Sequence, residues 1–418
     1  MTVLSEWIEF NPRVRLEKDK VYPFVSMDVI VPGKRFVSAA EERKFTGGGA
    51  KFCKGDTLFA RITPCLENGK ISQFVDERGA DGAFGSTEFF VLRAISGKST
   101  PEYVYYLSQT DLLREVAVKS MVGASGRQRA DIKVIRDLEL EPPPLEVQAR
   151  VGTVLSAYDD LIETNQRRIV LLEEAAGRLY REWIVNLRFP GHEAVKVVNG
   201  LPEGWERTTL GELVDRTDGS VVQTGPFGSQ LHRHEYVETG VPVVMPQDIV
   251  RDRVRNDRIS FVNDTTARRL SRHELRPLDI VFPRRGDISK RALIEEHQAG
   301  FLCGTGCLKI RVDPDSLHPV LLYHQLADPD MVRWVEGQAV GTTMLNLSAT
   351  ILRSVTCIIP SSDVQEMFVN FANQVRSQMD VLELQNAALA QARDALLPKL
   401  MGDQLDVSDI PLPQPEAA

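Results

Sequence analysis

Cysteine and histidine are the residue types in this chain that could hold a metal, and their spacing decides whether they do. The five cysteines are Cys53, Cys65, Cys303, Cys307 and Cys357. Cys303 and Cys307 lie in a segment that we interpret as a strand, and no second Cys or His pair follows at zinc-site spacing. His232 and His234 flank Arg233, without a third histidine or a carboxylate pair at ligand spacing. We therefore predict free buried thiols in a reducing compartment, a solvated loop at His232, and no metal site.

The motifs of nucleotide and methyl-transfer chemistry are missing from the sequence. An amino-methyltransferase would carry an NPPY-like tetrapeptide, and the nearest match is Asn11-Pro12-Arg13. No GxxxxGK[ST] phosphate loop is present to bind ATP. Isolated Asp and Glu residues are plentiful, but without a defined geometry they do not make a nuclease. We therefore expect no catalytic site and no cofactor.

The length and composition of the chain are those of a multidomain globular protein. Its 418 residues suit two or three domains. Hydrophobic residues make up 43% and charged residues 26%, which argues against a membrane protein and against wholesale disorder. No run of about 18 apolar residues occurs, and residues 1–20 lack the features of a secretory signal. We expect a cytoplasmic protein.

Charge is distributed unevenly along the chain. The formal net charge is −8, which alone disfavours nucleic acid as a partner because phosphates attract cations. Between Arg251 and Arg291, however, twelve Lys or Arg stand against six Asp or Glu, and between Lys34 and Lys70 eight stand against four. An ordinary solvated surface could also give such clusters. The overall acidity therefore does not exclude nucleic acid, because the basic clusters are local.

An internal repeat organises the sequence. Residues 55–61, GDTLFAR, are echoed by residues 278–284, LDIVFPR, and residues 85–93, GSTEFFVLR, by residues 304–311, GTGCLKIR. In both copies a helical stretch, a loop of small residues and a short strand ending in proline follow in the same order. The shared order predicts two α/β domains with one scaffold and divergent details.

A long helix follows each copy of the repeat. Residues spaced alternately by four and three form a heptad seam from Val151 to Trp183. Adding 217 to these residue numbers gives a second seam from Phe368 to Leu400, interrupted by the charged Arg393. The first helix would be about 58 Å long, so it would act as a spacer as well as a packing element. If the copies are related by a pseudo-two-fold axis, the helices pair antiparallel and the domains lie at their opposite ends.

Two asparagines fall on the seams, and one buried Asn can fix the register of a coiled coil. We predict that Asn165 and Asn386 lie close together and set this register. The predicted fold class is α/β (α+β), with two repeated domains separated by two long helices that form an antiparallel coiled coil. The predicted boundaries are 1–144 for the first domain, 145–187 for the central helix, 188–204 for a linker, 205–361 for the second domain, 362–402 for the C-terminal helix and 403–418 for a disordered tail.

Five segments, which make four separated matches because two of them belong together, resemble the specificity subunit of a type I restriction-modification system. GDTLFARITPCLENGKI, at residues 55–71, resembles the first target-recognition domain of that family. LPEGWERTTLGEL, at 201–213, and TGPFGSQL, at 224–231, resemble the start of the second. RLYREWIVNLRFPGHE, at 178–193, and ARDALLPKLMGDQL, at 392–405, resemble the ends of its two conserved helices. The resemblance extends over nearly the whole chain, and the order of the matches makes it more specific than any one of them.

The resemblance implies a non-catalytic subunit that reads DNA. Each target-recognition domain would read one part of an asymmetric, bipartite site in double-stranded DNA, and the helices would fix the unread spacer. Two methyltransferase subunits would bind the chain and modify adenines after base flipping. Restriction and translocation subunits would join them to cut unmodified DNA, as in defence against phage. Neither a membrane nor a cofactor of its own belongs to this function.

Two kinds of segment could contact DNA in such a subunit. Arg and Lys in the basic turn after each repeated strand could contact phosphates or guanine edges. In the loop of small residues, Gln and Asn could read adenine while Gly allows a close approach. The turn at residues 224–231 adds a serine and a glutamine. The predicted DNA-binding residues are Arg61, Thr63, Lys70, Ser125, Arg127, Gln128, Arg129, Ser229, Gln230, Arg284, Arg285, Lys290, Arg291, Thr342, Thr343 and Asn346.

Three other functions are compatible with parts of the pattern. A related specificity subunit, from a two-part recognition system that cleaves beside its site, would be distinguished by the adjacent genes. A fused restriction-methylation enzyme would transfer methyl groups as the purified chain alone. A structural coiled-coil adaptor would show no sequence-specific DNA binding, even with partners present.

Overall fold

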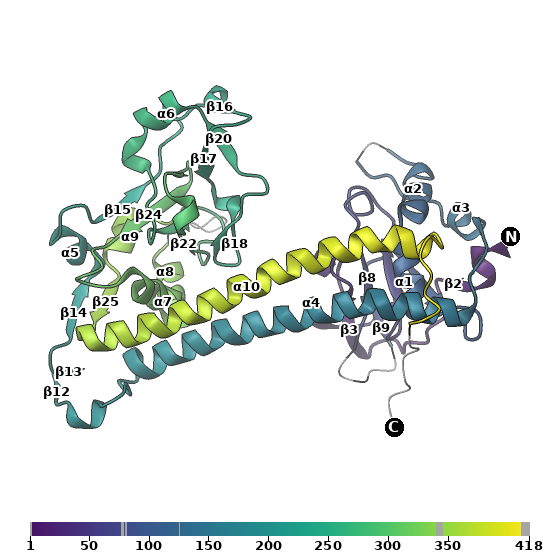
Figure 1. The fold of residues 1–418 in the computed structure, drawn as a ribbon, viewed down its shortest axis with the longest axis horizontal. Coiled ribbons are helices and arrows are strands. Elements are labelled where there is room, and N and C mark those ends of the chain that lie inside the picture. The colour runs from purple at the N-terminus through teal and green to yellow at the C-terminus, as the bar shows by residue number, and fades with distance from the viewer. Residues whose placement is uncertain (1, 77–78, 80–81, 125, 340–345, 411–418) are drawn as a thin grey trace. The chain divides into compact units, whose positions relative to one another are not determined.

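The chain folds as two compact units, and both long helices contribute to each of them. The computed structural model describes residues 2–76, 79, 82–124, 126–339 and 346–410. Unit 1 consists of residues 1–167 and 381–418, and unit 2 of residues 168–380. The long helices are α4 (Leu145–Tyr180), drawn in teal in Figure 1, and α10 (Ser362–Met401), drawn in yellow-green. Within the described residues, none of the helices is both long and apolar enough to span a membrane.

Unit 1 contains two sheets of four and five strands. The five-stranded sheet has the order β2 (Ile8–Phe10), β10 (Phe89–Ala94), β7 (Thr57–Ala60), β8 (Ile71–Phe74) and β4 (Phe36–Val37). The four-stranded sheet has the order β5 (Glu41–Lys44), β3 (Val21–Val25), β9 (Ala83–Gly85) and β6 (Ala50–Phe52). A short antiparallel pair joins β1 (Thr2–Val3) to β11 (Glu139–Leu140). The helices are α1 (Pro101–Gln109), α2 (Asp111–Lys119) and α3 (Ile132–Arg136).

Strand β7 shows how the sequence builds the core of unit 1. All four of its residues are buried, and successive side chains of a strand point to opposite faces. Leu58 therefore packs in one hydrophobic cluster, with residues of both sheets, while Phe59 packs in another. The second cluster also contains Leu155 of α4 and Leu400 of α10. The long helices are thus part of the same core as the five-stranded sheet.

Unit 2 also contains two main sheets, but its strands differ in length from those of unit 1. One sheet has the order β15 (Val221–Thr224), β24 (Cys307–Arg311), β21 (Ile280–Pro283) and β22 (Ala292–Leu293). The other has the order β16 (Tyr236–Val237), β20 (Ser260–Val262), β17 (Val241–Val244) and β23 (Leu302–Cys303). Short pairs join β14 (Glu206–Thr209) to β25 (Thr356–Ile359), β18 (Ile249–Val250) to β19 (Arg253–Val254), and β12 (Val197–Val198) to β13 (Leu201–Pro202). The helices are α5 (Leu210–Asp215), α6 (Asp264–Arg269), α7 (Pro319–Ala327), α8 (Pro329–Gln338) and α9 (Ala349–Arg353). The mixed α/β class predicted from the sequence is confirmed.

The repeat extends to individual hydrogen bonds. In unit 1, Gln148 of α4 accepts from the Thr100 amide at 3.1 Å and donates to two carbonyl oxygens, those of Lys98 and Pro143. In unit 2, a glutamine 217 positions later, Gln365 of α10, makes the same three kinds of bond. It accepts from the His318 amide at 2.9 Å and donates to the carbonyls of Ser316 and Pro360. The two long helices therefore occupy equivalent places in the two copies, with an offset of 217 residues.

A buried ion pair is also duplicated. Arg93 of β10 makes two hydrogen bonds with Asp56, at 2.7 and 2.6 Å. Arg311 of β24 makes the same two bonds with Asp279, at 2.7 and 2.6 Å. Planar bidentate pairs of this kind hold a fixed geometry as well as neutralising a buried carboxylate. Each pair links an interior strand of the sheet, β10 or β24, to the residue just before the neighbouring strand, β7 or β21.

The long helices run antiparallel inside each unit. In unit 1, Asn165 of α4 donates to Asn386 of α10 at 3.0 Å, and Asp159 lies against Arg393. Residue numbers therefore decrease along α10 in the direction in which they increase along α4, so the two helices are antiparallel. In unit 2 the seam consists of Ile169, Leu172 and Ala176 of α4 with Phe371, Val375 and Met379 of α10. The proximity of Asn165 and Asn386 is therefore observed, whereas their control of the register stays a prediction.

Several cysteine predictions need correction. All five cysteines are free, but Cys53 and Cys65 are only partly buried. Cys303 and Cys307 belong to two different strands, β23 and β24, rather than to one, because a turn separates them. Burial raises the pKa of Cys303 and of Cys357 to about 12, so these thiols stay protonated and packed.

The segment predicted as a disordered tail begins with ordered residues. Val407 is buried, and Ile410 packs against the same core of unit 1. An apolar side chain every few residues was too weak a pattern to reveal this packing. Residues 411–418, the rest of the predicted tail, lie outside the described residues.

Candidate nucleic-acid interface

In unit 1 the basic turn and the small-residue loop meet. The amide of Thr63 donates to the Gln128 carbonyl at 3.0 Å, and the amide of Gln128 donates to the Thr63 hydroxyl at 3.0 Å. Ile62 and Arg129 form an antiparallel bridge beside them. Two segments that the sequence predicted separately, some 65 residues apart, are thus one surface, which we call edge 1 (residues 61–63 and 127–129).

The arginines of edge 1 differ in how far their charge is already used. Glu88 accepts hydrogen bonds from Arg61 at 3.2 Å and from Arg129 at 2.6 Å. The bond from Arg129 is the main cause that lowers the pKa of Glu88, with a further contribution from Arg61. Arg127 is exposed, and among the described residues its guanidinium has no hydrogen bond or ion pair. Arg127 is therefore the cation of edge 1 with most charge left for a ligand.

Two other predictions in unit 1 have different outcomes. The ammonium of Lys70 donates to the Met27 carbonyl at 2.8 Å and is partly buried, so it ties two loops together instead of facing outward. Ser125 lies outside the described residues. The direction of the Lys70 side chain could not be read from the sequence, because the chain that supplies its acceptor is 43 residues away.

In unit 2 the equivalent backbone arrangement recurs. The Arg284 amide donates to the Gly306 carbonyl at 2.6 Å, and the Leu347 amide donates to the Arg284 carbonyl at 2.8 Å. Arg285 and Asn346 form an antiparallel bridge, as Ile62 and Arg129 do in unit 1. We call this surface edge 2 (residues 284–285 and 346). Thr342 and Thr343, predicted to belong to it, lie outside the described residues.

Edge 2 presents a different set of side chains. Arg285 is exposed, and among the described residues its guanidinium has no hydrogen bond or ion pair. Arg284 is partly buried and lies 5.0 Å from the centre of the Phe227 ring. Phe227 is 49% exposed, an aromatic that the sequence analysis missed. Its place between Pro226 and Gly228, in a segment already expected to be a turn, was the available signal.

The turn that holds Phe227 is fixed by glycine and by local bonds. A side chain at Gly225 would place its Cβ 2.0 Å from the Gly304 carbonyl oxygen, so the close backbone approach requires glycine. The side-chain oxygen of Gln230 accepts from the Phe227 amide at 3.2 Å, and Ser229 is exposed. Gln230 therefore shapes the turn, and Ser229 faces outward.

Two basic residues near edge 2, Arg291 and Lys290, have partners within the protein. Arg291 is 7% exposed and donates to the carbonyls of Ser289 and Leu326. Its guanidinium is buried, with Nη1 on these carbonyls and Nη2 on Asp252, so in this structure it is not exposed for the predicted DNA contact. Lys290 lies 3.5 Å from Asp287 and is 43% exposed, so it remains accessible.

His232 and His234, predicted to lie in a solvated loop without a metal, are both exposed. The rings of His232 and His234 stack 5.5 Å apart, and the His232 amide donates to Glu235 at 2.8 Å. No group of three or more His, Cys, Asp or Glu side chains that could hold a metal is found in the part of the chain that the structure describes.

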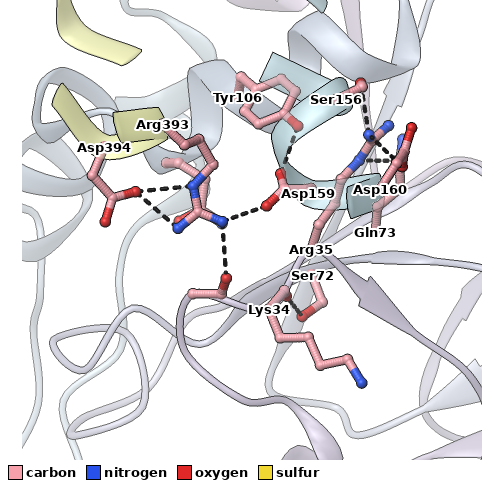
Figure 2. Close-up of polar contacts among 12 residues, drawn as sticks. Lys34, Arg35, Ser72, Gln73, Tyr106, Ser156, Asp159, Asp160, Arg393 and Asp394 are labelled. Carbon is pink, nitrogen blue, oxygen red and sulfur yellow. Dashed lines mark hydrogen bonds and ion pairs between the residues drawn. The ribbon is translucent and has the colours of Figure 1, made fainter. Parts of the chain in front are cut away.

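A buried polar cluster joins the long helices to the first domain in unit 1, as Figure 2 shows. The Tyr106 hydroxyl donates to Asp159 at 2.6 Å, and Arg393 donates to the same carboxylate. Arg393 also donates to the Gly33 carbonyl at 3.2 Å. Beside it, Arg35 donates to Ser156 of α4 at 2.6 Å and to Gln73 at 3.1 Å. Arg393, the charged residue that interrupts the second seam, therefore connects α10 to α4 and to the segment at Gly33.

Comparisons with known proteins find similarity to specificity subunits of type I restriction-modification systems. A family model described as "Type I restriction modification DNA specificity domain" matches residues 6–174. The MjaIX specificity subunit of Methanocaldococcus jannaschii, a type I restriction enzyme subunit, is 24% identical over 314 residues, which are 74% of this chain and 70% of that protein. The EcoEI specificity subunit of Escherichia coli is 31% identical over 157 residues, 36% of this chain and 26% of that protein.

The fold also has a solved counterpart. The crystal structure of a type I restriction-modification S subunit from M. genitalium superposes with a TM-score of 0.52 at 16% identity, covering 96% of this chain and 95% of that one. At this identity the likeness concerns the fold alone. Residues 6–174 thus match the DNA specificity domain of type I restriction-modification systems, and the chain is similar to specificity subunits of such systems and shares the fold of a solved S subunit.

Proposed function

We propose that this chain reads an asymmetric, two-part site in double-stranded DNA and performs no chemistry itself. Edge 1 would contact one part of the site and edge 2 the other. The observation that carries the proposal is the duplicated bridge: the same backbone arrangement holds Ile62 and Arg129 in one unit and Arg285 and Asn346 in the other. One scaffold with different side chains is what reading two different half-sites requires.

The side chains at the two edges have chemistry that suits DNA. An arginine can contact a phosphate or pair with two acceptors of guanine, and Asn or Gln can pair with adenine. Arg127 and Arg285 are exposed and available for either kind of contact. Phe227 offers an apolar surface next to Arg284, which could contact a thymine methyl group.

The catalytic work belongs, in this proposal, to partner subunits. Two methyltransferase subunits would bind the chain, flip the target adenines out of the duplex and methylate them. Restriction and translocation subunits would cut unmodified DNA. The long helices, which enter the core of both units, would fix the number of unread base pairs between the half-sites.

The test is to map methylated adenines in the genome of cells that carry this chain together with its methyltransferase partner. We expect one motif made of two different half-sites separated by a constant spacer. Cells with the methyltransferase alone are the control and should lack the motif. A single continuous motif would contradict the two-part reading. Methyl transfer to DNA by the purified chain alone would contradict a non-catalytic role.

A further inference from the structure

The repeat allows each contact between the long helices to be compared with the contact that a second copy would make. We use first half for residues 1–187, which end with α4, and second half for residues 205–418, which end with α10. Because Gln148 and Gln365 are equivalent, every seam position of α4 has a counterpart 217 residues later on α10. A first half could therefore pair with another first half in the geometry that α4 and α10 use now.

The polar contacts on the seam are not repeated, unlike those of the domains. Asp159 of α4 corresponds to Arg376 of α10, and Arg393 of α10 corresponds to Ala176 of α4. The two asparagines, Asn165 and Asn386, correspond to Leu382 and Ile169. Each polar pair thus takes one member from each helix, and neither helix carries both members.

The Asp159–Arg393 pair is deeply buried. The side chain of Asp159 is 4% exposed and that of Arg393 is 10% exposed. Burial acts against the guanidinium charge, but Asp159 and Asp394 outweigh it and raise the pKa of Arg393 above its usual value. A buried carboxylate or guanidinium that loses its partner is strongly destabilising, whereas the intact pair is tolerated.

Pairing of two first halves would remove this compensation. Asp159 would face Ala176 of the second copy, while Tyr106 of its own half would still donate to it. Asn165 would face Ile169 of the second copy. A carboxylate and an amide would therefore be buried against apolar side chains, twice over because of the two-fold symmetry.

Pairing of two second halves would bring like charges together. Arg393 of one copy would occupy the position that Ala176 of α4 occupies now. It would therefore lie next to Arg376 of the other copy. These two positions now line a cavity of about 570 Å³ in unit 2, together with Arg253 and Arg291. Arg376 already shares Glu295 with Arg253, at 3.1 and 3.2 Å, so the carboxylate bound to Arg376 already serves two guanidinium groups.

We propose that Asp159 and Arg393, assisted by Asn165 and Asn386, make each long helix select the helix of the other half and reject a copy of itself. The partner that fits α4 is a helix with an Asn and, seven residues later, an Arg on its seam. This selection is independent of what the two domains bind. It disfavours an exchange in which like halves of two copies of the chain pair with each other, even where the halves share one scaffold.

The experiment uses the full chain with a protease site inserted in the exposed turn between Asn199 and Gly200, cleaved after folding. Unlabelled and ¹⁵N-labelled preparations are mixed, and urea is raised below the unfolding transition until labelled and unlabelled halves have exchanged. Native mass spectrometry then measures the proportions of the three possible pairs of halves. Wild type should give pairs of unlike halves, at least about 100-fold in excess over either like pair.

The variants reverse or relieve the selection. Arg393→Asp should raise the share of second-half pairs by about 100-fold or more, because the new carboxylate of one copy can then pair with Arg376 of the other. Lys399→Asp, at an exposed cation on the same helix, is the matched control and should leave the proportions unchanged. If Arg393→Asp does not fold, Asp159→Asn serves instead, and it should increase first-half pairs. Statistical mixing of the wild-type halves, or unchanged proportions in both variants, would overturn the proposal.

Discussion

At the scale of single residues, the useful distinction is between cations that the fold has already neutralised and cations that it leaves exposed. Arg61 and Arg129 share Glu88, and Arg291 is buried against carbonyl oxygens. Arg127 and Arg285 are exposed and carry their full charge. Affinity for a phosphate backbone depends on charges that can replace counterions, so these two residues should matter more than their neighbours.

We expect Arg127→Ala and Arg285→Ala each to weaken binding of the assembled methyltransferase complex to its site by about 10-fold, with rates of methylation falling in parallel. Binding is measured over a range of salt concentrations. A residue that contacts phosphate should lower the salt slope by about one, and a residue that contacts a base should leave it unchanged. Lys119→Ala, at an exposed cation on α2, is the control. Unchanged affinity and slope with an unchanged melting temperature would remove the residue from the interface.

A buried histidine makes the stability of unit 2 dependent on pH. His273 is 1% exposed, and its Nε2 accepts a hydrogen bond from Arg272 at 2.9 Å, which requires a neutral ring. Burial first, and then the charges of Arg272 and Lys309, lower the pKa of His273 to about 4. The unfolded chain, with an ordinary histidine pKa near 6.5, therefore binds more protons between these two values.

Stability from this residue is fully present above about pH 6.5 and is lost as the pH falls toward 4, by up to about 3 kcal/mol. The measurement is urea unfolding of the full chain, followed by tryptophan fluorescence at several pH values. His273→Gln retains an acceptor for Arg272 and should flatten the pH dependence of the unfolding free energy. His297→Gln, at a side chain 61% exposed, is the matched control and should leave that dependence as it is. Equal slopes for the wild type and His273→Gln would refute this assignment.

At the scale of elements, periodicity predicted the long helices because it depends on many residues at once. The heptad spacing located the two seams, and the repeat located equivalent strands, where burial on both faces gives short apolar runs. The structure has α4 at Leu145–Tyr180 and α10 at Ser362–Met401, and Asn165 bonds Asn386. The helices and the repeat can be predicted even where single residues depart from the pattern, because no one side chain determines them.

Side-chain direction in turns could not be predicted in the same way. Lys70 and Arg291 belong to basic segments, yet each donates to carbonyls supplied by distant parts of the chain. Arg393 appeared in the sequence as a defect of the seam, because its partners Asp159 and Gly33 are 234 and 360 residues away. The meeting of Thr63 with Gln128 was equally invisible, although both residues were predicted to be at the site. What sequence patterns miss is the tertiary contact that gives a polar residue its role.

At the scale of the whole molecule, duplication explains how one chain carries two different surfaces. The contacts that build each domain are repeated, as with Arg93–Asp56 and Arg311–Asp279. The side chains at the two edges and the polar contacts on the helix seam are not repeated. Selection for a common scaffold, together with selection for different ligands, would produce this difference between repeated and unrepeated contacts. The net charge of −8 is compatible with it, because the basic excess is local, at residues 34–70 and 251–291.

If the long helices set the spacing between the half-sites, lengthening both should change the spacer and nothing else. A heptad inserted after Arg167 in α4 and another after Asp380 in α10 would preserve the seam and the Asn165–Asn386 pair. Seven residues add about 10.5 Å, which corresponds to about three base pairs of B-form DNA. The methylated motif should therefore keep both half-sites and gain about three base pairs between them.

The control for this experiment is a seven-residue insertion between Asn199 and Gly200, which lie in an exposed turn outside both helices. That chain should methylate the original motif with the original spacer. Adenine methylation mapped across the genome reads half-sites and spacer in one measurement, so a change in recognition can be told from a change in spacing. A helix-lengthened chain that still methylates the original spacer would show that the helices do not act as the ruler. Loss of methylation with retained folding would place the limit in the proposed methyltransferase partners, which would have to bridge the same distance.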